Sequence, residues 1–354
     1  MSTSSRWSQL QVELLGSPRR WLITGVAGFI GSNLLECLLK LDQEVVGLDN
    51  LSTGRRQNLD DVRQQVGEAR WRNFRFIEGD ITDLPTCQAA CAGIHIVLHQ
   101  AALGSVPRSI KTPLDTHHAN VTGFVTVLEA ARTAGIKRIV YASSSSVYGD
   151  HPDLPKREEI TGNVLSPYAA TKIMNEIYAG VWARCYGMEL LGLRYFNVFG
   201  RRQDPDGAYA AVIPKWIAQM LRGEVCHING DGETSRDFCY IANVCQANIL
   251  AATVTGKDAV NRAYNVACGA KKSLNELHAE IRADLPGLTI FQRQLAPVHE
   301  MFRPGDIRHS LADISAAQSR LGYTPTHTVA QGLQEALGWY AEHLGAPLAS
   351  KTPV

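Results

Sequence analysis

The stretch Thr24-Gly25-Val26-Ala27-Gly28-Phe29-Ile30-Gly31 decides the fold. It follows a short apolar run at residues 20–24 and opens a helical pattern at residues 32–41. The first glycine permits a tight turn, the second a close approach of backbone to pyrophosphate, and the third close helix–strand packing. The N-terminus of the following helix favours phosphate. The stretch therefore predicts a dinucleotide site, with these residues at the cofactor: Gly25, Gly28, Phe29, Ile30 and Gly31.

Alternating strand and helix patterns continue through the first two hundred residues. Strands are predicted at residues 44–48, 74–77, 94–98, 138–141 and 189–193, and helices at 84–91, 120–134 and 168–186. Such alternation is typical of a parallel, doubly wound sheet. The expected fold class is α/β, with a doubly wound parallel (Rossmann) sheet and a smaller interleaved C-terminal α/β substrate domain.

The composition changes beyond residue 194, where Pro, Gly and Asp cluster at residues 203–207 and 229–232. Four helical patterns are predicted there, at 213–221, 241–253, 274–285 and 329–343. We expect residues 1–18 to form an N-terminal leader outside the core. The other expected parts are a dinucleotide-binding Rossmann domain at 19–197 with a returning segment at about 233–265, a substrate domain at 198–232 and 266–345, and a tail at 346–354.

Bulk properties exclude several classes of protein. Lys and Arg number 35 and Asp and Glu 34, for a formal net charge of +1, so nothing favours a nucleic-acid partner or an anionic membrane. No apolar run could span a bilayer, and the N-terminus lacks a signal-peptide core. The eight cysteines are scattered and lack metal-ligand spacing. We therefore expect no metal, buried free thiols and a cytoplasmic location.

Tyr168 and Lys172 lie four residues apart, which is one helical turn. A neighbouring ammonium favours a phenolate, so the pair predicts a tyrosine pKa lowered toward neutrality and a usable proton acceptor. Taken alone, such a pair is more often a core tyrosine beside a solvated lysine. Beside a dinucleotide site it indicates alcohol–ketone chemistry.

Two acidic positions extend the predicted cofactor site. Asp49, followed by Asn50, ends the second strand, where a carboxylate binds the ribose hydroxyls and repels a 2′-phosphate. This favours NAD over NADP; the alternative is a turn or cap residue. Asp80 and Ile81 follow the third strand, where they could hold adenine, although a simple turn is also consistent with the sequence.

These motifs together resemble the extended short-chain dehydrogenase/reductase superfamily. Further motifs narrow the resemblance to nucleotide-sugar 4-epimerases, most closely to bacterial UDP-N-acetylglucosamine 4-epimerases of surface-polysaccharide pathways. It covers about residues 19–345. The motifs are Ser144-Ser145-Ser146-Val147-Tyr148-Gly149, Ser166-Pro167-Tyr168, Arg194-Tyr195-Phe196-Asn197-Val198-Phe199-Gly200, Gly232-Glu233-Thr234-Ser235-Arg236-Asp237-Phe238 and Arg303-Pro304-Gly305-Asp306.

The resemblance implies that Tyr168 takes the proton from the sugar 4-hydroxyl while the C4 hydride passes to a tightly bound NAD. The 4-keto sugar then rotates, and the hydride returns to its other face. Lys172 would bind the nicotinamide ribose, and Ala101 would also contact the cofactor. Composition alone leaves the choice within the run of four serines, residues 143–146, open. Counting back from Tyr148, as in the family, selects Ser144 for the 4-oxygen.

The resemblance also implies the UDP-sugar contacts. Ser145 and Ser146 would neighbour the substrate, Ala211 would pack near uracil, and Asp306 would hold the uridine ribose. Arg236 and Arg303 would bind the diphosphate, since a guanidinium suits phosphate oxygens; surface ion pairs are the alternative. Ser310 would lie beside the sugar 2-substituent, unless it is a small packing residue. Near the sugar or its phosphates would lie Ser105, Asn197 and Gln203; for Asn197 a strand-end turn is the alternative.

Three other functions are alternatives to a 4-epimerase. A 4,6-dehydratase needs an acid pair where Ser145 and Ser146 stand, and hydroxyls cannot perform that acid–base work at neutral pH. A UDP-glucuronate decarboxylase usually has a glutamate at position 146. A non-catalytic NAD-binding regulator typically loses the Tyr–Lys pair. We therefore expect an NAD-dependent UDP-sugar 4-epimerase, and the resemblance implies that it assembles as a homodimer through a four-helix bundle.

Overall fold

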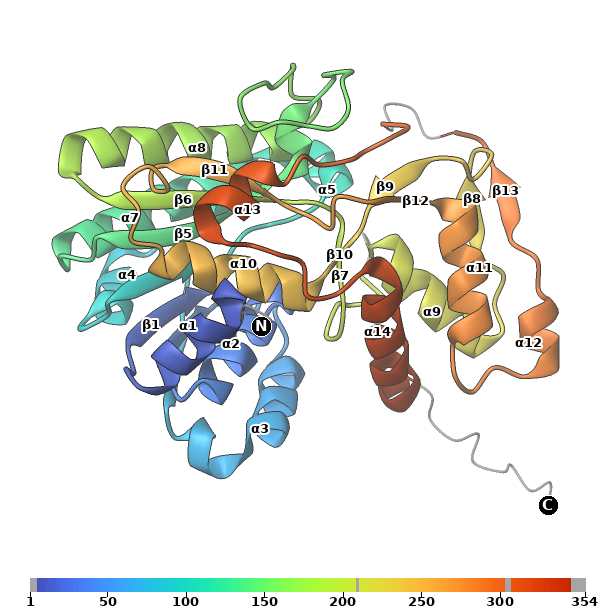
Figure 1. Cartoon of the computed structure of the whole chain (residues 1–354), viewed down its shortest axis with the longest axis horizontal. Coiled ribbons are helices and arrows are strands. Elements are labelled where there is room, and N and C mark those ends of the chain that lie inside the picture. Colours follow the sequence, from blue (N-terminus) through green and yellow to red (C-terminus); the bar gives the residue numbers. More distant parts are fainter. Residues whose placement is uncertain (1–4, 208–209, 303–306, 345–354) are drawn as a thin grey trace.

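A seven-stranded parallel sheet forms the centre of the chain in the computed structural model, which describes residues 5–207, 210–302 and 307–344 (Figure 1). The strand order is β11-β6-β5-β4-β1-β2-β3, and each neighbouring pair is parallel. The α/β doubly wound fold predicted from the sequence is confirmed. The strands of this sheet are β1 (Arg20–Thr24), β2 (Glu44–Asp49), β3 (Phe74–Glu78), β4 (Ile96–His99), β5 (Arg138–Ser144), β6 (Glu189–Tyr195) and β11 (Arg262–Val266).

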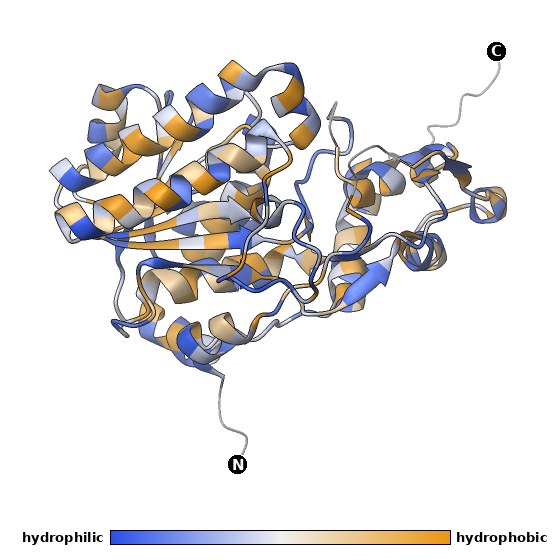
Figure 2. Cartoon of the chain, turned by 90° about the horizontal axis from the view of Figure 1, so that it is seen from above, coloured by the Kyte–Doolittle hydropathy of each residue, from blue (hydrophilic) through white to orange (hydrophobic). Residues whose placement is uncertain are grey.

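Helices cover both faces of the sheet, because strands buried on two sides need apolar partners on both. Figure 2 shows hydrophobic residues along the central strands and mixed colours on the covering helices. One face carries α1 (Arg6–Leu15), α2 (Phe29–Lys40), α3 (Arg56–Trp71) and α10 (Ile241–Thr253). The other carries α4 (Leu84–Cys91), α7 (Gly123–Thr133) and α8 (Pro167–Tyr186), and near these lie α5 (Val106–Lys111), α6 (Pro113–His117) and the single turns η1 (His118–Thr122) and η2 (Ser145–Tyr148).

The strand order reverses between β1 and β4, the two neighbours from which the chain proceeds in opposite directions across the sheet. A crevice at the carboxyl ends of the strands, beside such a reversal, is where open α/β sheets bind ligands. The glycine turn follows β1, and residues 100–105 follow β4. The fold therefore places the glycine turn, which is predicted to bind the dinucleotide, at the carboxyl ends of β1 and β4, where such a crevice is expected.

The later part of the chain forms a smaller lobe beside the carboxyl ends of the sheet (Figure 1). Its helices are α9 (Val212–Arg222), α11 (Leu274–Asp284), α12 (Ile290–Gln294) and α14 (Val329–Leu344), while α13 (Ser315–Leu321) lies near β11. Its short strands pair two by two: β7 (Val198–Phe199) with β10 (Cys239–Tyr240), β8 (His227–Asn229) with β13 (Val298–Glu300), and β9 (Ser235–Asp237) with β12 (Lys271–Ser273). The division into domains stays a prediction.

The leader expected to lie outside the core is instead largely the helix α1, so that expectation was wrong. Leu10 and Leu14 are four residues apart, share one helix face, and are 2% and 1% exposed. The Gln43 side chain donates to the Leu14 carbonyl at 2.9 Å. Burying each leucine contributes about 1.5–3 kcal/mol, so the leader residues from 5 onward pack as part of the Rossmann unit.

The helix α3 was not predicted, because its sequence is strongly polar. Its three buried side chains, Leu59, Val62 and Val66, nevertheless follow helical spacing, and this pattern could have revealed it. None of the helices in the described ranges is long and apolar enough to cross a membrane.

Candidate active site

The glycine turn is packed so tightly that a side chain would not fit. Gly25 has φ +70°, and a Cβ there would lie 2.7 Å from the Ala101 nitrogen. A Cβ on Gly31 would lie 2.1 Å from the Gly25 carbonyl oxygen. Both contacts are with backbone, which cannot move aside cheaply. The turn runs directly into α2, whose N-cap residue is Gly28.

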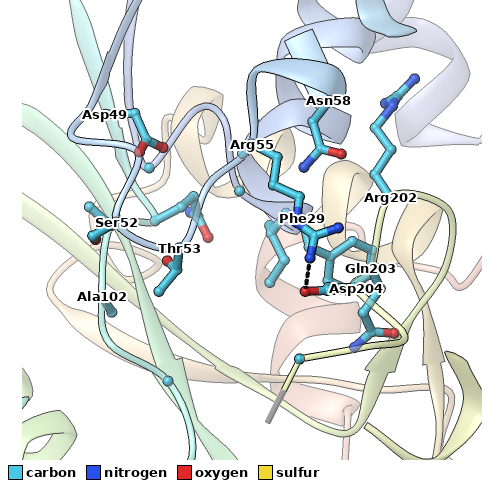
Figure 3. Close-up of a pocket in the computed structure, with 18 of the residues that line it drawn as sticks. Phe29, Asp49, Ser52, Thr53, Arg55, Asn58, Ala102, Arg202, Gln203 and Asp204 are labelled. Carbon is cyan, nitrogen blue, oxygen red and sulfur yellow. Dashed lines mark hydrogen bonds and ion pairs between the residues drawn. The ribbon is translucent and has the colours of Figure 1, made fainter. Parts of the chain in front are cut away.

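A cavity of about 950 Å³ opens beside this turn. Residues far apart in the sequence line it, from the turn, the ends of β2 and β3, and the segments near residues 100–105 and 202–211. Figure 3 shows Phe29, Asp49 and Arg55 among the lining residues. The lining includes thirteen of the predicted site residues: Gly25, Gly28, Phe29, Ile30, Gly31, Asp49, Asn50, Asp80, Ile81, Ala101, Ser105, Gln203 and Ala211.

Asp49 is buried at the end of β2 and organises the loops around it. Its carboxylate accepts hydrogen bonds from the Ala27 nitrogen at 2.9 Å and the Leu51 nitrogen at 2.8 Å. Burial raises its pKa, while these two hydrogen bonds act in the opposite direction. A carboxylate has acceptor positions beyond these two, so Asp49 can still receive ribose hydroxyls.

Asp80 lines the same cavity and contacts the loop after β2. Its carboxylate accepts from the Asn50 side chain at 2.7 Å and from the Thr82 nitrogen at 2.8 Å. The same side chain thus makes a turn and joins the loops after β2 and β3. The sequence allowed Asp80 either a place at the cofactor site or a simple turn. In the structure Asp80 makes the turn and also lines the cavity.

Tyr168, Lys172 and Ser144 converge where α8 meets the end of β5. The Ser166 hydroxyl caps α8 by accepting from the Ala169 nitrogen at 3.2 Å, which places Tyr168 in the first turn. The Lys172 ammonium donates to the Ala142 carbonyl at 2.9 Å and lies 5.9 Å from the centre of the Tyr168 ring. The Ser144 hydroxyl lies close enough to the Tyr168 phenol to lower its pKa. The three predicted catalytic groups therefore share one corner of the sheet.

The pKa of Tyr168 departs from the expected direction. Burial raises it, and the neighbouring Ser144 hydroxyl only partly opposes this. Lys172 lies beside the ring and is bonded to Ala142, so it is not a direct partner of the phenol oxygen. Burial also lowers the pKa of Lys172 to about 8. The lowering of the tyrosine pKa that the neighbouring ammonium predicts is therefore outweighed by burial.

The four serines of residues 143–146 have different partners. Ser143 is buried and donates to a carboxylate oxygen of Glu176 at 2.6 Å. The Ser144 hydroxyl accepts from the Ser146 nitrogen at 3.1 Å and the Ser146 hydroxyl at 3.0 Å. Ser144 is the member of the run whose hydroxyl neighbours the Tyr168 phenol; its role at the 4-oxygen stays a prediction.

Of the predicted substrate residues, Asn197 follows β6, Arg236 lies in β9, and Ser310 lies beside β9. The Asn197 side chain donates to the Asp237 carbonyl at 3.1 Å, and the Arg236 guanidinium donates to the Arg308 carbonyl at 3.1 Å. The Ser310 nitrogen donates to the Ser235 carbonyl at 3.0 Å. None of the described residues Ser144, Ser145, Ser146, Asn197, Arg236 and Ser310 lines the large cavity itself. Arg303 and Asp306 lie outside the described residues.

Gln203 lies between the two groups of predicted residues and has an unused acceptor. Its side-chain nitrogen donates to the Val198 carbonyl at 3.1 Å, but its Oε1 atom is buried without a hydrogen-bond partner within the described part of the chain. Buried amide oxygens are usually bonded. Because Gln203 also lines the cavity, this oxygen is available to a bound ligand.

Several residues of the cavity were missed from the sequence. Arg55 forms an ion pair with Asp204 at 2.5 Å, and the pair joins the loop before α3 to the segment after β7 (Figure 3). Arg202, fully buried, binds Glu36 and Asp61, each at 2.5 Å. The sequence had marked residues 203–207 as a cluster of Pro, Gly and Asp, and among them only Gln203 as a site residue. No local pattern assigns partners to these arginines.

Comparison with known proteins matches residues 21–267, more than half of the chain, to a family described as the NAD dependent epimerase/dehydratase family. The chain belongs to this family. The UDP-glucose 4-epimerase of Mycolicibacterium smegmatis is 35% identical over 326 residues, which cover 91% of this chain and 98% of that protein. The resemblance to the UDP-hexose 4-epimerases is thereby confirmed, as are an enzyme and its NAD cofactor.

Two solved epimerase structures share the fold of this family member. The UDP-glucose 4-epimerase of Thermotoga maritima with UDP-glucose is 32% identical, with a TM-score of 0.82 and coverage of 92% of this chain and 99% of that one. The UDP-N-acetylglucosamine 4-epimerase of Methanobrevibacter ruminantium, in complex with UDP-N-acetylmuramic acid, is 36% identical, with a TM-score of 0.83 and the same coverage.

The residues of this family member fit NAD. The glycine turn excludes side chains where a pyrophosphate would approach, the Asp49 carboxylate lines the cavity, and the buried Gln203 oxygen has no protein partner among the described residues. In the described part of the chain, no cluster of three or more His, Cys, Asp or Glu side chains could hold a metal ion.

Proposed function

We propose that this protein interconverts UDP-N-acetylglucosamine (UDP-GlcNAc) and UDP-N-acetylgalactosamine (UDP-GalNAc), and turns over UDP-glucose and UDP-galactose more slowly. The broader activity, an NAD-dependent UDP-sugar 4-epimerase, is the one that the family and the relatives support. The convergence of Tyr168, Ser144 and Lys172 where α8 meets the end of β5 is the observation that carries it. Assays with UDP-GlcNAc and UDP-glucose, given separately with resolved products, test the proposal.

The three converging side chains have distinct roles in this proposal. The Tyr168 oxygen removes the proton from the sugar 4-hydroxyl and returns it, while the Ser144 hydroxyl holds the 4-oxygen. Lys172, held by the Ala142 carbonyl, binds the nicotinamide ribose. When bound, NAD supplies a reversible hydride acceptor and a positive charge. That charge and the ammonium together favour the phenolate, which offsets the effect of burial on the pKa of Tyr168.

The residues after Ser144 argue against dehydration or decarboxylation. Elimination across C5–C6 requires an acid and a base, but Ser145 and Ser146 carry only hydroxyls. The Ser146 hydroxyl is moreover bonded to that of Ser144 at 3.0 Å. An epimerase needs nothing more at these positions than polar neighbours of the sugar.

The nucleotide extracted from enzyme purified without added cofactor should be NAD, and the enzyme should work without supplementation. Asp49→Asn should lower the preference for NAD over NADP by roughly tenfold or more, since a carboxylate near a 2′-phosphate adds like-charge repulsion. Mass spectrometry of the extract and competition binding measure both effects. Asp80→Asn is the matched control and should weaken both dinucleotides alike. An unchanged preference in Asp49→Asn would remove Asp49 from ribose recognition.

The N-acetyl preference rests on Ser310, a small half-buried side chain whose backbone is tied to β9. Besides the bond from its nitrogen to the Ser235 carbonyl, its neighbour His309 meets the Ser235 hydroxyl through a ring nitrogen at 2.9 Å. These bonds hold the position of Ser310 beside Arg236. A serine there leaves room for an acetamido group and offers it a hydroxyl.

Ser310→Tyr should lower kcat/KM for UDP-GlcNAc on the order of 10–100-fold and spare UDP-glucose, because the added ring fills the space of the acetamido group. Ser310→Ala is the control: it keeps the space and removes only the hydroxyl, so it should change the ratio of the two kcat/KM values by a small factor. If Ser310→Tyr affects both sugars equally, Ser310 is not the gate and the N-acetyl proposal loses its main support.

The proposal includes a homodimer formed by α7 and α8 of each copy. The face of α8 away from the sheet exposes Met174, Ile177 and Tyr178, and Ile177 is 59% exposed. Exposed apolar side chains in a contiguous patch are typical of interfaces. A cytoplasmic location and a role in supplying sugars for surface polysaccharides complete the proposal; among the described residues the cysteines form no disulfide.

A further inference from the structure

Glu176 lies on α8, one helical turn beyond Lys172 and two beyond Tyr168. Its side chain is 15% exposed and contacts neither the large cavity nor the predicted substrate residues. It faces the ends of two strands instead. Glu176 is not part of the motifs that carry the family resemblance, so they assign it no role in the reaction.

The Glu176 carboxylate ties α8 to both neighbouring strands. One oxygen accepts from the Ser143 hydroxyl of β5 at 2.6 Å and from Nε of Arg194 of β6 at 2.9 Å. The other oxygen accepts from Nη2 of Arg194 at 2.8 Å. A buried bidentate ion pair has a narrow range of allowed geometries, so it sets how α8 sits against the two strands.

Arg194 extends the same network to the turn that follows Ser144. Its guanidinium is 6% exposed and lies 4.9 Å from the centre of the Tyr148 ring, and it donates to the Glu158 carbonyl at 3.0 Å. The Tyr148 hydroxyl in turn donates to Asn265 of β11 at 2.6 Å. The carboxylate of Glu176 thus lies at the junction of the helix with the base, the strand end with Ser144, and the η2 turn.

We propose that Glu176 is a positioning residue for the reaction. Its carboxylate holds Ser143, and thereby the backbone of Ser144, at a set distance from the helix that carries Tyr168 and Lys172. This inference rests on the proposed role of Tyr168 as the base. A misplacement of about 1 Å between reacting groups can cost on the order of 10²-fold in rate, so an anchor outside the site can affect turnover without touching the substrate.

Two variants test this role. Glu176→Gln keeps the shape and removes the charge, and Ser143→Ala removes only the tie to β5 and leaves the buried ion pair intact. Because Ser143→Ala loses a single hydroxyl, it keeps the test open even if Glu176→Gln folds poorly. Both should lower kcat, on the order of 10–100-fold for Glu176→Gln, while KM for the UDP-sugar and the NAD content stay at wild-type values.

The control is Glu189→Gln, which removes an ion pair with Arg138 that joins the same two strands, β5 and β6, at their opposite end. It should lower stability without lowering kcat. A second readout does not depend on turnover: NMR of protein with ¹³C-labelled tyrosine rings, in which the Tyr168 signal is identified by its loss in Tyr168→Phe. Glu176→Gln and Ser143→Ala should shift that signal, and Glu189→Gln should not.

The two readouts separate this inference from the proposed function. If the wild-type protein turned over no UDP-sugar, the function would fail, while the Tyr168 signal would still decide whether Glu176 positions it. The positioning role is overturned if the Tyr168 signal stays in place in both variants, or if Glu189→Gln changes kcat and that signal equally.

Discussion

Replacing Tyr168 with phenylalanine should lower kcat on the order of 10²–10⁴-fold, while the fold and the bound NAD remain. The substitution removes only the phenol oxygen, which is the proposed proton acceptor, and keeps the ring beside Lys172. The interaction of the phenol with the Ser144 hydroxyl is lost with it, so the 4-oxygen loses the base and Ser144 loses a neighbour that orients it. Steady-state kinetics with UDP-GlcNAc, circular dichroism and the nucleotide content of the purified variant measure the three parts of this expectation.

A matched control stands on the same helix. Tyr178 is half-exposed on the outer face of α8, so Tyr178→Phe should keep kcat near the wild-type value. Turnover of Tyr168→Phe at a rate close to that of Tyr178→Phe would rule out Tyr168 as the base, and with it the proposed mechanism.

Arg202→Met should lower the free energy of unfolding by about 3–5 kcal/mol, because it removes one partner of a buried ion-pair network. The Arg202 side chain is fully buried between Glu36 and Asp61. In the variant Glu36 would keep its ion pairs with Arg201 and Lys40, whereas Asp61 would lose the guanidinium that binds it. Backbone strain should not change, because φ is +68° at this residue and neither side chain favours that conformation. Urea unfolding measures the loss.

The control for Arg202→Met is Arg222→Met. Arg222 forms an ion pair with Asp206 in which the two side chains are 46% and 51% exposed, and such surface pairs contribute about 1 kcal/mol or less. If Arg202→Met and Arg222→Met lowered the free energy of unfolding equally, the buried ion pairs of Arg202 would contribute no more than a surface pair.

The Arg202 effect should also depend on pH. Burial would raise the pKa of Glu36, but Arg202, Arg201 and Lys40 outweigh it, so the pKa lies below its ordinary value of 4.5. A carboxylate with a lowered pKa contributes its full stabilisation above the ordinary value and loses it as the pH falls through the folded one. The difference between wild type and Arg202→Met should therefore narrow as the pH falls below 4.5.

The strands and helices that were predicted correctly are those with strong local patterns. The helices α4 and α10 begin and end at the predicted residues, and the strand predicted at 20–24 is β1. The strand β11 was missed, because Arg262, Asn265 and their neighbours form no apolar run and become a strand only by pairing with β6. The leader was assigned wrongly because its two buried leucines stand in an otherwise polar segment.

The sequence by itself determined the cofactor turn, the alternation of the sheet and the spacing of Tyr168 and Lys172. These depend on glycine positions and on periods of two to four residues, which are local properties. Only the tertiary structure decided that Ser143 binds Glu176 while Ser144 meets Tyr168, and that burial raises the pKa of Tyr168. It likewise joined Arg202 to Glu36 and Asp61, 166 and 141 residues away. Such partners meet only when the chain folds back on itself. A short window of sequence therefore cannot predict which distant side chain forms the hydrogen bond.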